Sequence, residues 1–131
     1  MDNRLHRVKM TDLLAPTIFE TIKEEMPNEL NDLKKVKGVI LYEILKNGKS
    51  AGKWTMDLTN PPGDVYEGEP RNGVRPTVSV VMEDDIFVLL VAGELDPVKA
   101  FMSGKVKAKG NIMLLQKLTT IMKKVNAQAK L

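Results

Sequence analysis

The chain has 131 residues, a formal net charge of +3 and no cysteine. The length fits one folded domain, the small positive charge is too weak to indicate nucleic-acid binding, and the lack of cysteine excludes disulfides and thiolate chemistry. No apolar run reaches the roughly 18 residues that a transmembrane helix needs. Aromatic residues make up only 5% of the chain, whereas methionine occurs 8 times. Methionine fills ordinary cores, and it also suits sites that accept ligands of varied shape.

The N-terminal part of the chain predicts an arm followed by two helices. Residues 1–11 are polar and aperiodic, so we expect a flexible arm ahead of a folded domain over 12–128. Pro27 ends the first helix, and Asn28 can cap a short second helix. The first helix is indicated by apolar residues that recur every four positions, namely Leu14, Ile18, Ile22 and Met26.

The middle of the chain predicts strands, and the first two are joined by a tight turn. Apolar residues dominate 39–44, and Asn47-Gly48 favours a type I′ hairpin because both central residues of that turn need a positive φ. The return strand over 52–58 has one apolar and one polar face. We therefore expect a sheet with one face toward water. Short strands near 65–67 and 77–82 follow.

The C-terminal part predicts three helices and one more strand. Asp84 and Asp85 stand where a strand gives way to a helix, so capping of that helix is their expected role. The predicted segments are a helix over 84–92, a helix over 97–103, a strand over 105–109 and a helix over 112–125. Because early strands join through hairpins, we expect a mainly antiparallel sheet of the α+β class, with its apolar face covered by helices.

Residues that could carry catalysis are scarce. The only histidine, His6, lies in the predicted arm, where it is expected to be an exposed bystander. No His, Cys, Asp or Glu cluster has the spacing of metal ligands, and no glycine-rich phosphate loop occurs. We therefore expect no catalytic residue, no metal and no cofactor.

Two features favour binding over chemistry. The final helix is apolar around more than half of its circumference, so it must lie against the core, bind a partner or close over a cavity; periodicity alone leaves these three open. Lysines cluster over 34–37 and again over 105–109. Such clusters are ordinarily solvated surface, and the functional alternative is attraction to an anionic membrane.

Three segments, 53–58, 82–87 and 93–113, resemble the sterol carrier protein type 2 family, and within it the lipid-binding domain of peroxisomal multifunctional enzyme type 2. The resemblance extends over about 14–131. It implies a five-stranded sheet covered on one face by helices, with a hydrophobic tunnel between the two layers. It also implies that the protein binds fatty acids, fatty acyl-CoA, sterols or phospholipids without reaction.

The resemblance also implies which residues contact the ligand. Among them, the neutral amide of Gln116 could orient a ligand's polar end, because apolar pockets use few polar groups for specificity. The full set of implied ligand-binding residues is Ile18, Ile22, Tyr42, Met56, Leu58, Val80, Met82, Phe87, Leu90, Phe101, Met113, Gln116 and Leu118.

The end of the chain, Ala129-Lys130-Leu131, resembles the Ser-Lys-Leu peroxisomal address. Together with the family resemblance, it implies a peroxisomal import receptor as a partner. We therefore expect the protein in the peroxisome and also in the cytoplasm, as a monomer whose main partner is a lipid. Two alternatives stay open: a protein-interaction or substrate-presenting module for peroxisomal lipid-metabolising enzymes, and a piece of a larger enzyme.

Overall fold

The computed structural model describes residues 13–129, with side chains up to residue 127. The predicted arm over 1–11 lies outside the described residues, and so do the side chains of the predicted targeting tripeptide, 129–131. The elements in chain order are α1 (Ala15–Glu25), the 3-10 helix η3 (Met26–Glu29), α2 (Leu30–Leu33), β1 (Val39–Lys46), β2 (Lys49–Asp57), β3 (Asp64–Glu67), the 3-10 helix η4 (Arg71–Gly73), β4 (Val78–Glu83), α3 (Asp84–Ala92), α4 (Pro97–Met102), β5 (Val106–Gly110) and α5 (Ile112–Ala129).

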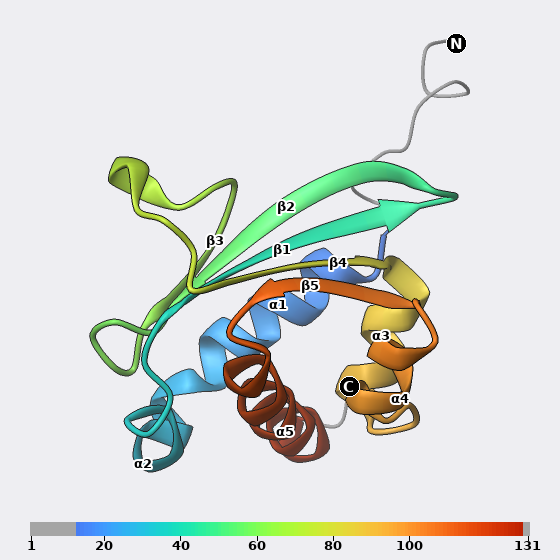
Figure 1. Cartoon of the computed structure of the whole chain (residues 1–131). Helices are drawn as coiled ribbons and strands as arrows, with labels where there is room; N and C mark the ends of the chain where they lie inside the picture. The colour runs from blue at the N-terminus through green and yellow to red at the C-terminus, as the bar shows by residue number, and fades with distance from the viewer. Residues whose placement is uncertain (1–12, 130–131) are drawn as a thin grey trace, which may run out of the picture.

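The five strands form one sheet in the order β3-β2-β1-β4-β5. All neighbouring strands are antiparallel except β1 and β4, which run parallel. Figure 1 shows the sheet as one layer, with α1, α3, α4 and α5 together on one side of it. The α+β class, the five strands and the one-sided helical cover are therefore confirmed.

The hairpin between β1 and β2 forms where the sequence predicts it. Asn47 and Gly48 both have positive φ, 55° and 80°, as a type I′ turn requires. The Glu83 carboxylate, at the end of β4, accepts hydrogen bonds from the backbone N–H groups of Asn47 and Gly48 at 3.0 and 2.8 Å. The turn is thus held by its own geometry and by a side chain from a neighbouring strand.

Alternation along the strands buries one face of the sheet. Ile40, Tyr42 and Ile44 of β1 are buried, and the corresponding residues of β2 and β4 continue this layer. The opposite face is not wholly open to water, however. Thr55, expected on the polar face, is fully buried because its hydroxyl donates to the Gly68 carbonyl at 2.7 Å under the loop after β3.

Asp84 caps a helix other than the one that the sequence predicts. It is 2% exposed, and its carboxylate accepts the backbone N–H groups of Leu14 and Ala15, each at 2.9 Å. These groups belong to the N-terminus of α1, whose first N–H groups have no partner within the helix. No side chain caps α3 itself. The expected capping of α3 is therefore corrected: Asp84 joins the start of α1 to the junction of β4 and α3.

Four aromatic rings fill the core between α1, the sheet and α3. The Phe19 ring lies 4.7 to 5.3 Å, centroid to centroid, from the rings of Phe87, Trp54 and Tyr42. This packing fixes α1 and α3 against the same part of the sheet.

Candidate functional site

A pocket of about 60 Å³ lies between the sheet and the helices α3, α4 and α5. Its floor comes from β1, β4 and β5, and its walls come from the three helices, which lie together under the sheet in Figure 1. Apart from Gln116 and Thr119, all of the lining residues are apolar or aromatic, and none is charged. The complete lining is Tyr42, Met82, Phe87, Leu90, Val91, Pro97, Val98, Phe101, Val106, Ile112, Leu115, Gln116, Thr119 and Met122.

Six of the residues that the resemblance implies for ligand binding come together in this pocket. They come from two strands, α3, α4 and α5, segments that lie far apart in the sequence. These six are Tyr42, Met82, Phe87, Leu90, Phe101 and Gln116.

The other seven residues lie elsewhere. Six are buried in the core without lining the pocket: Ile18, Ile22, Met56, Leu58, Val80 and Leu118. Met113 is on the surface, with 65% of its side chain exposed, and it does not line the pocket. The ligand-binding role of all thirteen residues stays a prediction.

Of the three α5 residues that the resemblance implies, Gln116 lines the pocket, and Met113 and Leu118 do not. Ile112, Leu115, Thr119 and Met122 line the pocket, and they recur at intervals of three and four, the spacing of one helix face. This spacing groups the four residues on one face of the helix in the sequence. Periodicity does not show which of the several faces of α5 meets a cavity.

The polar groups in the pocket are mostly satisfied within the protein. The Tyr42 hydroxyl donates to the Met122 sulfur at 3.5 Å, and the Thr119 hydroxyl donates to the Leu115 carbonyl at 2.8 Å. Burial raises the pKa of the Tyr42 phenol above its ordinary value of 10, so it stays neutral and cannot act as a base near neutral pH. Gln116 is half-buried and carries an amide that both donates and accepts.

The chemistry of the lining suits an apolar guest. Burying a charge without a partner is costly, so a lining without charged groups favours hydrocarbon over an ionised group. The hydrophobic tunnel that the resemblance implies is not shown: the lining residues enclose about 60 Å³, well below the roughly 300–1,000 Å³ of pockets that bury a drug-sized ligand. An extended guest would need the lining side chains to move apart.

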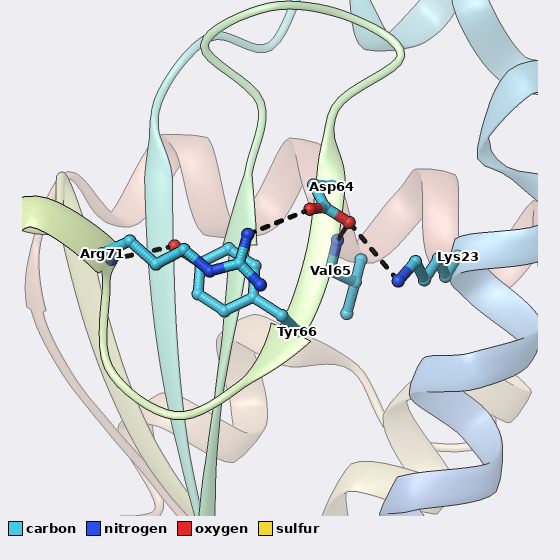
Figure 2. A network of polar contacts seen from close by, with 5 residues as sticks. All are labelled: Lys23, Asp64, Val65, Tyr66 and Arg71. Atoms are coloured by element: carbon cyan, nitrogen blue, oxygen red, sulfur yellow. Dashed lines mark hydrogen bonds and ion pairs between the residues drawn. The ribbon is translucent and has the colours of Figure 1, made fainter.

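Two polar clusters outside this pocket are structural. In Figure 2, Asp64 pairs with Lys23 of α1 and with Arg71 of η4, each at 3.6 Å, and the Arg71 guanidinium lies 3.8 Å from the centre of the Tyr66 ring. These side chains are about half exposed. Exposed pairs of this kind contribute little to stability, so the cluster serves mainly to position the loop after β3 beside α1.

The second cluster joins α5 to the segment after α1. The Lys124 ammonium contacts the Asp32 carboxylate at 3.0 Å and the Glu29 carboxylate at 3.2 Å. The hydrogen bond that Lys124 donates to Asp32, together with the charge of Lys124, lowers the pKa of Asp32, and the same hydrogen bond is the largest cause of the raised pKa of Lys124. Among the described residues, no group of three acids or histidines could hold a metal ion. None of the described helices is long and apolar enough to cross a membrane.

Comparison with known proteins places this fold in a family. Residues 19–123 match the model of the SCP-2 sterol transfer family. The chain is 45% identical over 91 residues to the peroxisomal multifunctional enzyme type 2 of Mus musculus, a match that covers 70% of this chain and 12% of that protein. The chain therefore spans a small fraction of the length of that relative.

Solved structures of proteins named as sterol carrier proteins are similar to this chain. The apo form of sterol carrier protein 2 from Yarrowia lipolytica superposes with a TM-score of 0.76 and 28% identity, covering 89% of this chain and 95% of that one. Palmitated SCP2L2 from Aedes aegypti superposes with a TM-score of 0.62 and 27% identity, covering 81% and 91% of the two chains. The family match extends over well more than half of the chain; the chain belongs to the SCP-2 sterol transfer family.

Proposed function

We propose that this protein binds the hydrocarbon part of a lipid in the pocket between the sheet and α3, α4 and α5, and that it performs no chemistry on it. The observation that carries the proposal is the composition of the pocket: apolar side chains from six elements, two neutral polar residues and no charge. Family membership supports it, and so does the palmitate on the Aedes aegypti relative.

The proposed ligands are fatty acids, fatty acyl-CoA, sterols and phospholipids, which share a long apolar part. Burying about fifteen methylenes contributes about 12 kcal/mol. After an association cost of about 4 kcal/mol, about 8 kcal/mol remains, which corresponds to micromolar affinity without a charged anchor. The implied tunnel would form when the ligand parts the lining side chains. Met82 and Met122 have flexible side chains that suit such a change. Gln116 is proposed to orient the polar end of the ligand.

No pair of groups in the pocket is arranged for catalysis. Thr119 is engaged with its own helix, Tyr42 is neutral, and neither has a base beside it in the lining. Nucleophilic catalysis needs a nucleophile activated by an adjacent base or by a lowered pKa. A carrier without a reaction therefore fits the pocket better than an esterase or thioesterase.

A fluorescent fatty acid tests the proposal by titration. We expect saturable, micromolar binding that unlabelled fatty acid and fatty acyl-CoA reverse. Val98→Glu places a charge at the pocket lining, and Val74→Glu is its matched control, since the two valines are 41% and 46% exposed and only Val98 lines the pocket. We expect Val98→Glu to weaken binding at least about ten-fold because the charge disfavours hydrocarbon beside it, and Val74→Glu to leave it unchanged. The absence of saturable binding, or equal effects of the two variants, would refute the proposal.

A second candidate function is presentation of lipids to a peroxisomal lipid-metabolising enzyme. The observation that favours it is the likeness to a small part of peroxisomal multifunctional enzyme type 2. We further propose that residues 129–131 are read by the peroxisomal import receptor. A reporter protein that ends in the last residues of this chain should enter peroxisomes, and it should stay outside them when Leu131 is deleted; equal import of both would contradict the receptor proposal.

A further inference from the structure

Most of the large exposed apolar side chains lie on two elements that line the pocket. Among the described residues, six large hydrophobic side chains are exposed, and four of them lie on α4 and on the first turn of α5. Met102 is 80% exposed, and Val98 and Phe101 line the pocket while they also reach solvent. We call these four residues with their neighbouring lysines the mouth surface: Val98, Phe101, Met102 and Met113, with Lys99, Lys105 and Lys117.

The part of the chain that begins with α4 carries positively charged side chains and no acidic ones. Residues 97–131 contain eight lysines and no Asp or Glu, whereas residues 1–96 contain twelve basic and seventeen acidic residues. All three mouth lysines are exposed, and they precede or follow residues that line the pocket. In the part of the chain that the structure describes, the ion pairs use other basic residues. The nearest acids in sequence, Glu94 and Asp96, lie just before α4.

We propose that the mouth surface docks on an anionic phospholipid bilayer. Apolar side chains can enter the boundary between headgroups and acyl chains, while lysines beside them contact lipid phosphates. Either signal alone gives weak attachment, whereas apolar contact and basic charge together give measurable binding. A surface with cations and no interleaved carboxylates complements an anionic membrane.

Docking in this way would place the pocket beside the bilayer. Val98 and Phe101 belong both to the docking surface and to the pocket lining. A lipid could therefore pass between bilayer and pocket without exposing its hydrocarbon to water, whose contact with apolar surface is unfavourable. Only this route of transfer rests on the proposed function; the docking itself does not depend on what the pocket holds.

Sedimentation with lipid vesicles tests the charge contribution. We expect the protein to bind vesicles that contain phosphatidylserine, to bind phosphatidylcholine vesicles far less, and to be released by high salt. The variant Lys99→Gln/Lys105→Gln/Lys117→Gln should bind anionic vesicles about 100-fold more weakly, at about five-fold for each lysine near the surface. The matched control removes the same charge from the other exposed cluster: Lys34→Gln/Lys35→Gln/Lys37→Gln.

A single apolar substitution tests the other half of the surface. Met102→Ser should weaken binding to anionic vesicles about ten-fold because a buried methionine side chain contributes to membrane contact roughly as it does to a protein core. Met102 does not line the pocket, so binding of an uncharged fluorescent fatty alcohol without vesicles should be unchanged. Val74→Ser, an exposed valine on the loop before β4, is the control and should bind vesicles as the natural chain does.

Three outcomes would overturn the proposal. The first is a natural chain that ignores anionic vesicles while it still binds the fatty alcohol, which would leave the proposed function standing. The second is equal loss in the mouth and control lysine variants, which would indicate diffuse charge attraction. The third is a chain that dimerises through Met102 and Met113 at micromolar concentration, which would assign the surface to a second copy.

Discussion

Asp84 offers a sharp test of how the fold is held together, because its carboxylate caps a helix that begins about 70 residues earlier in the chain. Replacing Asp84 with Ala removes the acceptor of two backbone N–H groups, those of Leu14 and Ala15, both at 2.9 Å. Ala15 is fully buried, and Asp84 is nearly so. Water therefore cannot readily replace the lost acceptor of Ala15, whereas the Leu14 bond is only partly buried. The substitution leaves at least one unsatisfied donor at the start of α1.

The size of the effect follows from these two bonds. A hydrogen bond to a charged group contributes about 1.5–3 kcal/mol, and the cost of burying the carboxylate offsets part of this gain. We expect Asp84→Ala to lower the free energy of unfolding by about 2–4 kcal/mol, at or above the upper end for loss of a helix cap. For a domain of this size, this corresponds to a fall in Tm of roughly 8–16 °C. Asp84→Asn keeps one acceptor of the same shape, so it should lose about half as much.

Thermal and urea unfolding followed by circular dichroism measures these changes. Asp85→Ala is the matched control, because Asp85 is exposed in the first turn of α3, where a carboxylate contributes at most about 1 kcal/mol through the helix dipole. Equal losses in the Asp84 and Asp85 variants would mean that both act on α3 alone. That result, or an Asp84→Ala variant as stable as the natural chain, would refute the cross-chain cap.

Further variants test the pocket and the second polar cluster. Leu115→Trp should fill the pocket and weaken fatty-acid binding at least about ten-fold in a chain that still folds, since overpacking costs about 1–3 kcal/mol; unchanged affinity by fluorescence titration would place the ligand elsewhere. Thr119→Val should leave affinity nearly unchanged, because its hydroxyl is engaged by its own helix, and a large loss of affinity would show that the hydroxyl contacts the ligand. Lys124→Met should lower the free energy of unfolding and change how it depends on pH. Urea unfolding at intervals of about one pH unit, from about pH 3 to about pH 7, measures this dependence. The pKa of Asp32 is lowered in the folded chain from 3.8 by Lys124, so its contribution is present above that value and is lost as the pH falls through the folded pKa. The natural chain should therefore lose more stability than the variant on acidification, and parallel curves would contradict the pairing.

Local patterns in the sequence determine much of the secondary structure. Asn47-Gly48 makes the hairpin because few residues adopt positive φ at low cost. Asp96 and Asn111 cap the helices that follow them, each by accepting the backbone N–H of the residue three positions later. The strand alternation predicts which face of the sheet is buried. The sequence predicts the ends of the elements less accurately than their type: β2 begins three residues earlier than predicted, and α5 continues four residues further.

The parallel pairing of β1 with β4 and the true partner of Asp84 are decided only by tertiary structure. Strand alternation reports which face is buried, but it does not report which strands are neighbours. An aspartate at a strand–helix junction has the same local signature whether it caps its own helix or another. Its two acceptor bonds reach α1 because the fold brings that helix end beside the end of β4.

For the pocket too, the sequence predicts local features and the tertiary structure decides their surroundings. The sequence predicts that α5 is too apolar for a simple surface helix, because its apolar residues occupy more than one face. The face that meets the cavity, with Ile112, Leu115 and Thr119, is selected by where α3 and α4 pack against the sheet. Met113 belongs to the same apolar run, yet it points to solvent. Periodicity assigns residues to faces of a helix, whereas the surroundings of each face depend on contacts between segments far apart in the chain.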